Sequence, residues 1–102
     1  MSKYRNIKTE VDGITFASKR EANRYCELLM LQRAGYLTNL ELQKSFELRV
    51  HGVLVCRYVA DFVYRDSVGR EVVEDAKGVK TALYRIKAKL MIACHGLRVI
   101  ET

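Results

Sequence analysis

The sequence predicts an α/β protein in which a mixed β-sheet is flanked by two helices and preceded by an N-terminal hairpin. Segments with helical spacing of apolar residues alternate with strand-like segments, in the order hairpin, helix, three strands, helix, strand. A helix between a meander and a final strand indicates a crossover onto the same sheet. The length of 102 residues fits a single domain, residues 1–102, with a modest core.

The first two elements are a hairpin over residues 8–16 and a helix over residues 18–34. An Asp-Gly pair between β-prone residues predicts a two-residue hairpin turn. Ser18 begins the helix, and Gly35 ends it as a left-handed cap. The residues expected on its buried face recur at helical spacing and are Ala22, Cys26, Leu29 and Met30.

Residues 40–77 are expected to form a meander of three antiparallel strands. A tight His-Gly turn leads from the first strand, residues 40–50, into the second, residues 53–64. The third strand, residues 71–77, follows a three-residue Ser-Val-Gly loop in which the glycine takes the left-handed conformation. This loop fixes the register of the second and third strands.

A second helix is predicted over residues 81–94, followed by a last strand over residues 97–101. Lys80, Tyr84 and Lys87 recur at i, i+4 and i+7 and form a basic stripe with one aromatic residue. Such a stripe is either a solvated helix face or a surface that contacts phosphates. The expected buried stripe of this helix is Leu83, Ile86, Leu90 and Ala93 or Cys94.

The predicted register brings two carboxylates together. Counting outward from the loop sets Asp61 opposite Asp75, and Lys77 follows on the same strand face as Asp75. Directly opposed residues have Cβ atoms about 5 Å apart, and two carboxylates at that distance repel unless a cation lies between them. Such oxygen ligands suit Mg²⁺. The alternative is a solvated hairpin end, and a register shift of one residue would make Glu74 the rival of Asp75.

The chain is basic, with 18 Lys and Arg against 12 Asp and Glu and a formal net charge of +6. A basic surplus on a small domain favours a polyanionic partner, nucleic acid before a membrane. No segment is apolar and long enough to span a bilayer or to act as a signal peptide, so a cytoplasmic location is expected.

The cysteines and histidines do not form a metal-binding pattern. Cys26, Cys56 and Cys94 are odd in number and widely spaced, which indicates buried thiols rather than a disulfide framework or a zinc site. His51 and His95 each lie beside a glycine at an expected turn.

Glu21, in the first turn of the first helix, has two interpretations. It completes a capping box with Ser18, or it adds a third carboxylate pointed toward the strand pair. The residues alone favour the cap.

The ordered pattern of the whole chain resembles the PD-(D/E)XK nuclease superfamily. The matching features are S-K-R-E-A in the first helix, a later L-Q, then A-D-F, E-D-A-K-G and a basic helix. The likeness is strongest to small phage-encoded members related to Holliday junction resolvases and transposon-end nucleases. It extends from the K-T-E-V-D-G-I-T-F hairpin to the last strand, and it implies a restriction-endonuclease-like core.

In this resemblance Asp61 and Asp75 match the two acids of the motif and Lys77 matches its lysine. Glu21 matches a helix glutamate that many members add to the metal site, so the resemblance makes it a ligand. The carbonyl of Ala76 would add another oxygen to the metal site. Lys77 would orient or help deprotonate the attacking water.

Two positions depart from the motif or fit it poorly. Gln43 matches a glutamine that precedes the first acid in transposon-end relatives, but a tight turn before the second strand sets Leu42 opposite Asp61 instead. Ala60 stands where the motif usually has proline, which affects the backbone more than the chemistry.

The resemblance implies a homodimeric endonuclease that hydrolyses DNA, including branched DNA, with one or two Mg²⁺ ions or with Mn²⁺. If the protein is phage-encoded, it would act in the host cytoplasm. The implied DNA contacts are Lys80, Tyr84, Lys87 and Gln43. Two alternatives are a nucleic-acid-binding module without catalysis and a basic structural or regulatory protein with a protein partner.

Overall fold

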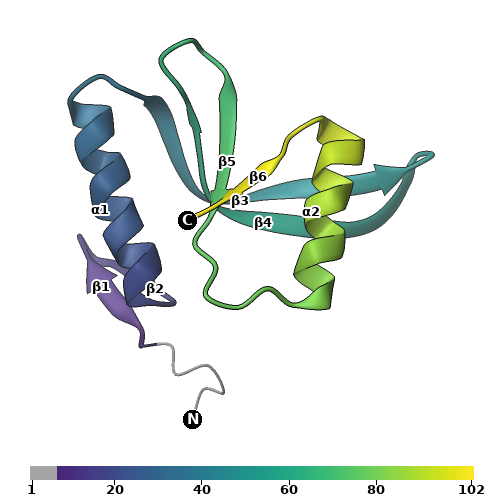
Figure 1. The fold of residues 1–102 in the computed structure, drawn as a ribbon, viewed down its shortest axis with the longest axis horizontal. Coiled ribbons are helices and arrows are strands. Elements are labelled where there is room, and N and C mark those ends of the chain that lie inside the picture. The colour runs from purple at the N-terminus through teal and green to yellow at the C-terminus, as the bar shows by residue number, and fades with distance from the viewer. Residues whose placement is uncertain (1–6) are drawn as a thin grey trace.

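The structure is a computed structural model that describes residues 7–102, and it contains two helices, a two-stranded hairpin and a four-stranded mixed sheet (Figure 1). The elements are β1 (Thr9–Val11), β2 (Ile14–Phe16), α1 (Lys19–Arg33), β3 (Thr38–Val50), β4 (Val53–Arg65), β5 (Glu71–Asp75), α2 (Ala82–His95) and β6 (Val99–Glu101). The larger sheet has the order β3-β4-β5-β6, and β6 is parallel to β5 while the other neighbours are antiparallel. The predicted α/β class, hairpin, mixed sheet and flanking helices are therefore confirmed. None of the described helices is long and apolar enough to cross a membrane.

Both helices begin at a hydroxyl cap and end at a left-handed glycine. The side chains of Ser18 and Thr81 each accept a hydrogen bond from the backbone N–H three residues on, at 3.2 and 3.1 Å. Gly35 and Gly96 have φ of 85° and 67°. Glycine adopts this left-handed conformation at little energetic cost because it has no Cβ. These local signals place the helix ends within a residue or so of the predicted bounds.

The buried faces of both helices differ from the predicted ones. In α1 the expected stripe is wrong for Cys26 and for Met30, which is 68% exposed. The face is rotated because Tyr25 packs on Phe16 of β2, with ring centroids 5.0 Å apart. The buried residues of α1 are Glu21, Ala22, Tyr25 and Leu28.

In α2 the predicted stripe is also wrong at its first turns, since Leu83 is 60% and Ile86 is 56% exposed. Tyr84 and Met91 are buried instead. Tyr84 packs against Tyr58 of β4, with ring centroids 6.4 Å apart. In both helices an aromatic ring outside the predicted stripe, Tyr25 or Tyr84, is part of the core.

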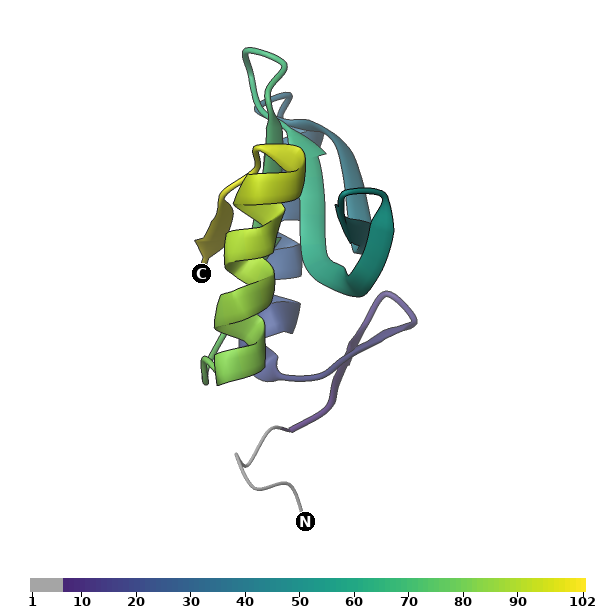
Figure 2. The ribbon, with the colours of Figure 1, turned by 90° about the vertical axis from the view of Figure 1, so that its right-hand side faces the viewer.

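Strands β3 and β4 change faces midway along their length. Tyr58 and Ala60 belong to the core under α2, whereas Phe62 and Tyr64 belong to the core under α1. Residues two apart in a regular strand share one face, so this ribbon twists over between Ala60 and Phe62. In Figure 1 the paired strands run down beside α1 and then turn across behind α2, and Figure 2 shows the curl from the side. Gln43, at this point of β3, has φ of 53°, in the left-handed region.

A bulge in β4 shifts the register with β3. It leaves Val55 as an extra residue, so the partners from Cys56 to Val63 move by one, and a second irregularity near Thr38 reverses the shift. Leu42 pairs with Phe62, and Gln43 lies opposite Asp61. The prediction that Leu42 would lie opposite Asp61 is therefore wrong, because it assumed an uninterrupted ladder from the tight turn.

Candidate active site

Asp61 and Asp75 lie at corresponding positions of β4 and β5. The two strands pair in the predicted register as far as Phe62 and Glu74, and the aspartates are the next residues outward. The backbone N–H of Ala76 donates a hydrogen bond to Oδ2 of Asp61 at 2.9 Å. β5 ends at Asp75, two residues before the predicted end of the strand.

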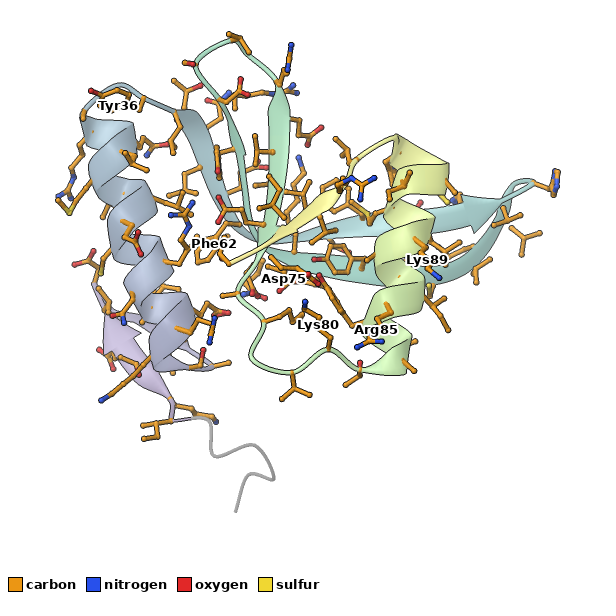
Figure 3. The ribbon with its side chains drawn as sticks, in the orientation of Figure 1. Tyr36, Phe62, Asp75, Lys80, Arg85 and Lys89 are labelled. Carbon is orange, nitrogen blue, oxygen red and sulfur yellow. The ribbon has the colours of Figure 1, made fainter. Side chains whose placement is uncertain are left out.

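Asp75 is fully buried, with 0% exposure, at the end of β5, which is an inner strand of the sheet (Figure 3). Burial raises the pKa of Asp75 to about 7, and its interaction with the Asp61 carboxylate acts in the same direction, while Tyr58 and Lys77 act against it. Burial also raises the pKa of Asp61, and the negative charge of Glu21 adds to that effect. The raised pKa favours the protonated form of the Asp75 carboxyl, as expected for two acids that compete for one site.

The two oxygens of Asp75 have different surroundings. The hydroxyl of Tyr58 donates a hydrogen bond to Oδ2. Oδ1 is buried and accepts no hydrogen bond from residues 7–102, although Nζ of Lys77 lies 3.2 Å away as an ion pair. The same ammonium lies 4.8 Å from the ring centroid of Tyr84. Lys77 thus offers this buried oxygen an ion pair, without the geometry of a hydrogen bond.

Two cavities meet at Glu21 and Asp61. The larger, about 390 Å³, lies between the start of α1 and the segment after β5, and Lys77 and Ala76 form part of its wall together with Arg20. The smaller, about 280 Å³, lies toward the hairpin. Solvent and a ligand therefore have room on both sides of these carboxylates.

Glu21 serves the helix cap and the cavity together. Its backbone N–H donates to Oγ of Ser18, as the capping interpretation predicts. Within the described part of the chain, however, the Glu21 carboxylate makes no return bond to the Ser18 N–H, and it lines both cavities with Asp61 instead. Both interpretations of this residue thus hold in part.

Gln43 joins the same group of side chains. Its Nε2 donates to Oδ1 of Asp61 at 3.4 Å, across the strand pair. The smaller cavity is lined by Gln43, Glu21 and Asp61. The register that set Leu42 opposite Asp61 had placed Gln43 away from this group, and the observed register brings it there.

Glu74 has a separate role on the opposite face of β5. Arg24 of α1 donates to its two carboxylate oxygens at 2.7 and 2.8 Å, and the hydroxyl of Tyr64 donates to one of them. This bidentate pair ties α1 to the sheet and neutralises Glu74. Of the two adjacent acids, Asp75 is the one beside Asp61.

The basic stripe expected on α2 is not a single exposed face. Tyr84 is only 7% exposed because its ring is part of the core, and this overturns its predicted place on the surface. Lys80 is exposed and forms an ion pair with Glu101 of β6 at 3.0 Å. Lys87 is half-buried.

Two residues of the site were not predicted from the sequence. Tyr58 reaches Asp75 only because β4 changes faces after Ala60, and no local pattern indicates that change. Arg20 lines the larger cavity and donates to the Thr102 carbonyl at 3.4 Å. Its position two residues after the helix cap was the only available hint.

The donor set fits Mg²⁺ in one particular manner. Across residues 7–102, no group of three or more His, Cys, Asp or Glu side chains is arranged to hold a metal ion by itself. Mg²⁺, however, is commonly held by one or two carboxylates, with water and substrate phosphate as the remaining ligands. Asp61 and the undonated Oδ1 of Asp75 supply oxygens of that kind.

Fold and site together define an α/β protein in which a buried aspartate, Asp75, lies beside a partly buried one, Asp61, and a lysine. The chain belongs to DUF1064, a family described as proteins of unknown function, which matches residues 1–96. The comparison with curated proteins found no match, and the comparison with solved structures found none either.

Proposed function

We propose that this protein is a metal-dependent DNA endonuclease of the PD-(D/E)XK type, built on a restriction-endonuclease-like core. The observation that carries the proposal is the convergence of Asp61, Asp75 and Lys77, with Nζ of Lys77 3.2 Å from the undonated Oδ1 of Asp75. Two acids and a lysine from neighbouring strands, in this order, are what the superfamily motif requires. Perturbed carboxyl pKa values beside a cavity also favour an active site.

Asp61 and Asp75 would hold the metal ion, with Glu21 and the Ala76 carbonyl as further oxygens on the cavity wall. A divalent ion bound there supplies Lewis-acid activation of water and offsets charge on the phosphate. Lys77 is the nearest cation to Asp75, and its ammonium would donate to the attacking water or to a phosphate oxygen. The carboxylates cannot approach a phosphate without a cation, because like charges repel at this distance.

The proposed substrate is DNA, with branched DNA such as a four-way junction included. The net charge of +6 favours a polyanion, and Arg20 adds a cation to the cavity that holds Lys77. A homodimer follows from the symmetry of the substrate, since two strands related by a two-fold axis require two copies of one site.

The test is cleavage of supercoiled plasmid and of a four-way junction in Mg²⁺, in EDTA, and with Lys77→Ala. Cleavage of either substrate in Mg²⁺ alone is expected, with EDTA abolishing it and Lys77→Ala lowering it by at least about 100-fold. A panel of linear, flapped, nicked and branched DNA then defines the preferred shape. Equal cleavage under all three conditions would assign the activity to something other than this site.

A nucleic-acid-binding module without catalysis is the second candidate. One observation favours it: the net charge of +6 favours a polyanionic partner whether or not the site is catalytic. Salt-sensitive binding of DNA, together with intact substrate in both Mg²⁺ and Mn²⁺, would support this candidate over the endonuclease.

A further inference from the structure

A groove with a volume of about 400 Å³ runs between α2 and β6, outside the site described above. Its cations are Arg85 and Lys89 of α2 and Arg98 of the loop before β6, and all three are exposed. Arg85 and Lys89 are four residues apart, so they lie on one face of the helix with Cβ atoms about 6 Å apart. None of these residues was a predicted DNA contact.

The cations of this groove are not neutralised by the protein. Among residues 7–102, no carboxylate lies within ion-pair distance of Arg85, Lys89 or Arg98. The one acid that lines the groove is Glu101, and it is paired with Lys80 at 3.0 Å. The hydrogen bond from Lys80 holds the pKa of Glu101 below its usual value, and the charge of Arg85 acts in the same direction. A multiply charged anion would offset the remaining positive charge.

The groove is lined by both apolar and charged side chains. Ile92 and Val99 line it together with the three cations. The backbone of a nucleic acid combines the same two kinds of surface, since charged phosphates are separated by sugars with apolar faces. One helical turn between Arg85 and Lys89 is comparable with the separation of successive phosphates along a strand.

The groove continues from the candidate active site. Lys80 follows the segment that lines the larger cavity, and its partner Glu101 lines the groove. Figure 3 shows Asp75, Lys80, Arg85 and Lys89 succeeding one another from β5 to α2.

We infer that the groove formed by Arg85, Lys89 and Arg98 binds the phosphate backbone of DNA on one side of the cleaved bond. The inference rests on the proposed function for the choice of DNA as the polyanion. These three cations, rather than the stripe of Lys80, Tyr84 and Lys87, would then hold the flanking strand. Contacts of this kind position DNA without selecting its sequence.

The test compares two triple variants of equal charge in binding to a short fluorescent DNA duplex. The groove variant is Arg85→Gln with Lys89→Gln and Arg98→Gln. The control removes three exposed arginines from the end of α1 and the β4–β5 turn, and its substitutions are Arg33→Gln, Arg65→Gln and Arg70→Gln. Affinity is measured at several salt concentrations between about 50 and about 200 mM, where phosphate contacts dominate the salt dependence. Circular dichroism confirms that both variants are folded.

The groove variant is expected to bind about tenfold more weakly or worse and to lower the slope of log affinity against log salt by about 2 to 3, since each phosphate contact contributes about 0.9. The control is expected to stay within about threefold of the wild type. Equal losses in both variants, no loss in the groove variant, or a wild type that does not bind DNA would overturn the inference.

Cleavage distinguishes this inference from the proposed function. If the wild type binds DNA through the groove but cuts no substrate, DNA binding by the groove is supported and the endonuclease proposal is refuted. If the wild type cuts DNA and the groove variant binds it equally well, the endonuclease proposal is supported and DNA binding by the groove is refuted.

Discussion

Gln43 and Asp61 lie opposite each other where β3 and β4 change faces, and the Gln43 amide donates to the Asp61 carboxylate at 3.4 Å. Because of this change, two tyrosines six residues apart on β4 reach opposite faces of β5. Tyr58 bonds Asp75 on the α2 side, and Tyr64 bonds Glu74 on the α1 side. The change of faces thereby gives each acid its own tyrosine, one for the structural Glu74 and one for the candidate metal ligand Asp75.

The left-handed backbone at Gln43 determines which side chains this position tolerates without loss of stability. Gln43→Gly is expected to change the free energy of unfolding by less than about 1 kcal/mol, because glycine tolerates φ of 53°. Gln43→Val is expected to cost about 2 kcal/mol or more, since a β-branched residue is strained there. Urea unfolding of both variants checks this, and equal stability of the two would contradict the left-handed conformation.

The hydrogen bond from Tyr58 lowers the pKa of Asp75. Tyr58→Phe is therefore expected to raise that pKa above about 7 and to cost about 1 kcal/mol of stability. The matched control, Tyr64→Phe, removes an equivalent bond to Glu74 and should leave Asp75 unchanged. An NMR titration of the Asp75 carboxyl carbon reports the difference, and a lower pKa in Tyr58→Phe would contradict the assignment.

The buried Asp75 carboxyl makes stability fall as pH rises. Its pKa is about 7 in the folded protein and near 4 in the unfolded chain, so between these values the folded state holds the extra proton. The stabilisation is complete below about pH 4 and is lost as pH rises through about 7. Asp75→Asn removes this dependence.

In metal-free buffer, Asp75→Asn is expected to be more stable than the wild type at pH 8, by up to about 4 kcal/mol, and similar to it at pH 4. Urea unfolding at both pH values, in EDTA, measures the difference. Asp66→Asn in the β4–β5 turn is the control, since its amide oxygen preserves the turn bonds to Val68 and Arg70. A variant less stable than the wild type at pH 8 would show that ionised Asp75 is well compensated.

The pair between Arg24 and Glu74 ties α1 to the sheet. Arg24→Met leaves Glu74 buried without its cation and is expected to cost about 3 kcal/mol. Glu27→Gln removes the exposed partner of the same arginine, and its expected cost is below about 0.5 kcal/mol. Thermal or urea unfolding of both variants gives the comparison, and similar costs would show that Glu74 is not the anchor.

Local chemistry in the sequence predicts much of this fold. The Asp-Gly turn, the caps at Ser18 and Thr81 and the loop ending in Gly69 are specified by neighbouring residues. The same loop fixes the β4–β5 register and therefore the meeting of Asp61 with Asp75. Signals of this kind do not depend on distant parts of the chain.

The rest depends on long-range packing. The bulge at Val55 and the left-handed Gln43 arise as β3 and β4 curl between two cores, and neither has a local pattern. Helical periodicity predicted both helices but not which of their faces are buried. The predicted stripes consisted mainly of aliphatic residues, whereas Tyr25 and Tyr84 are buried in the structure. The contact between Tyr58 and Asp75 follows from the same curl.

The most direct measurement of the central claim is calorimetric titration of Mn²⁺ into the wild type, Asp61→Asn, Asp75→Asn, Glu74→Gln and Glu47→Gln. Glu74→Gln tests the acid on the opposite face, and Glu47→Gln is an exposed control that removes one charge. The wild type and both glutamine variants are expected to bind the ion, and both asparagine variants to lose at least about tenfold in affinity. Absence of binding by the wild type, or equal binding by all five proteins, would contradict a metal site at Asp61 and Asp75.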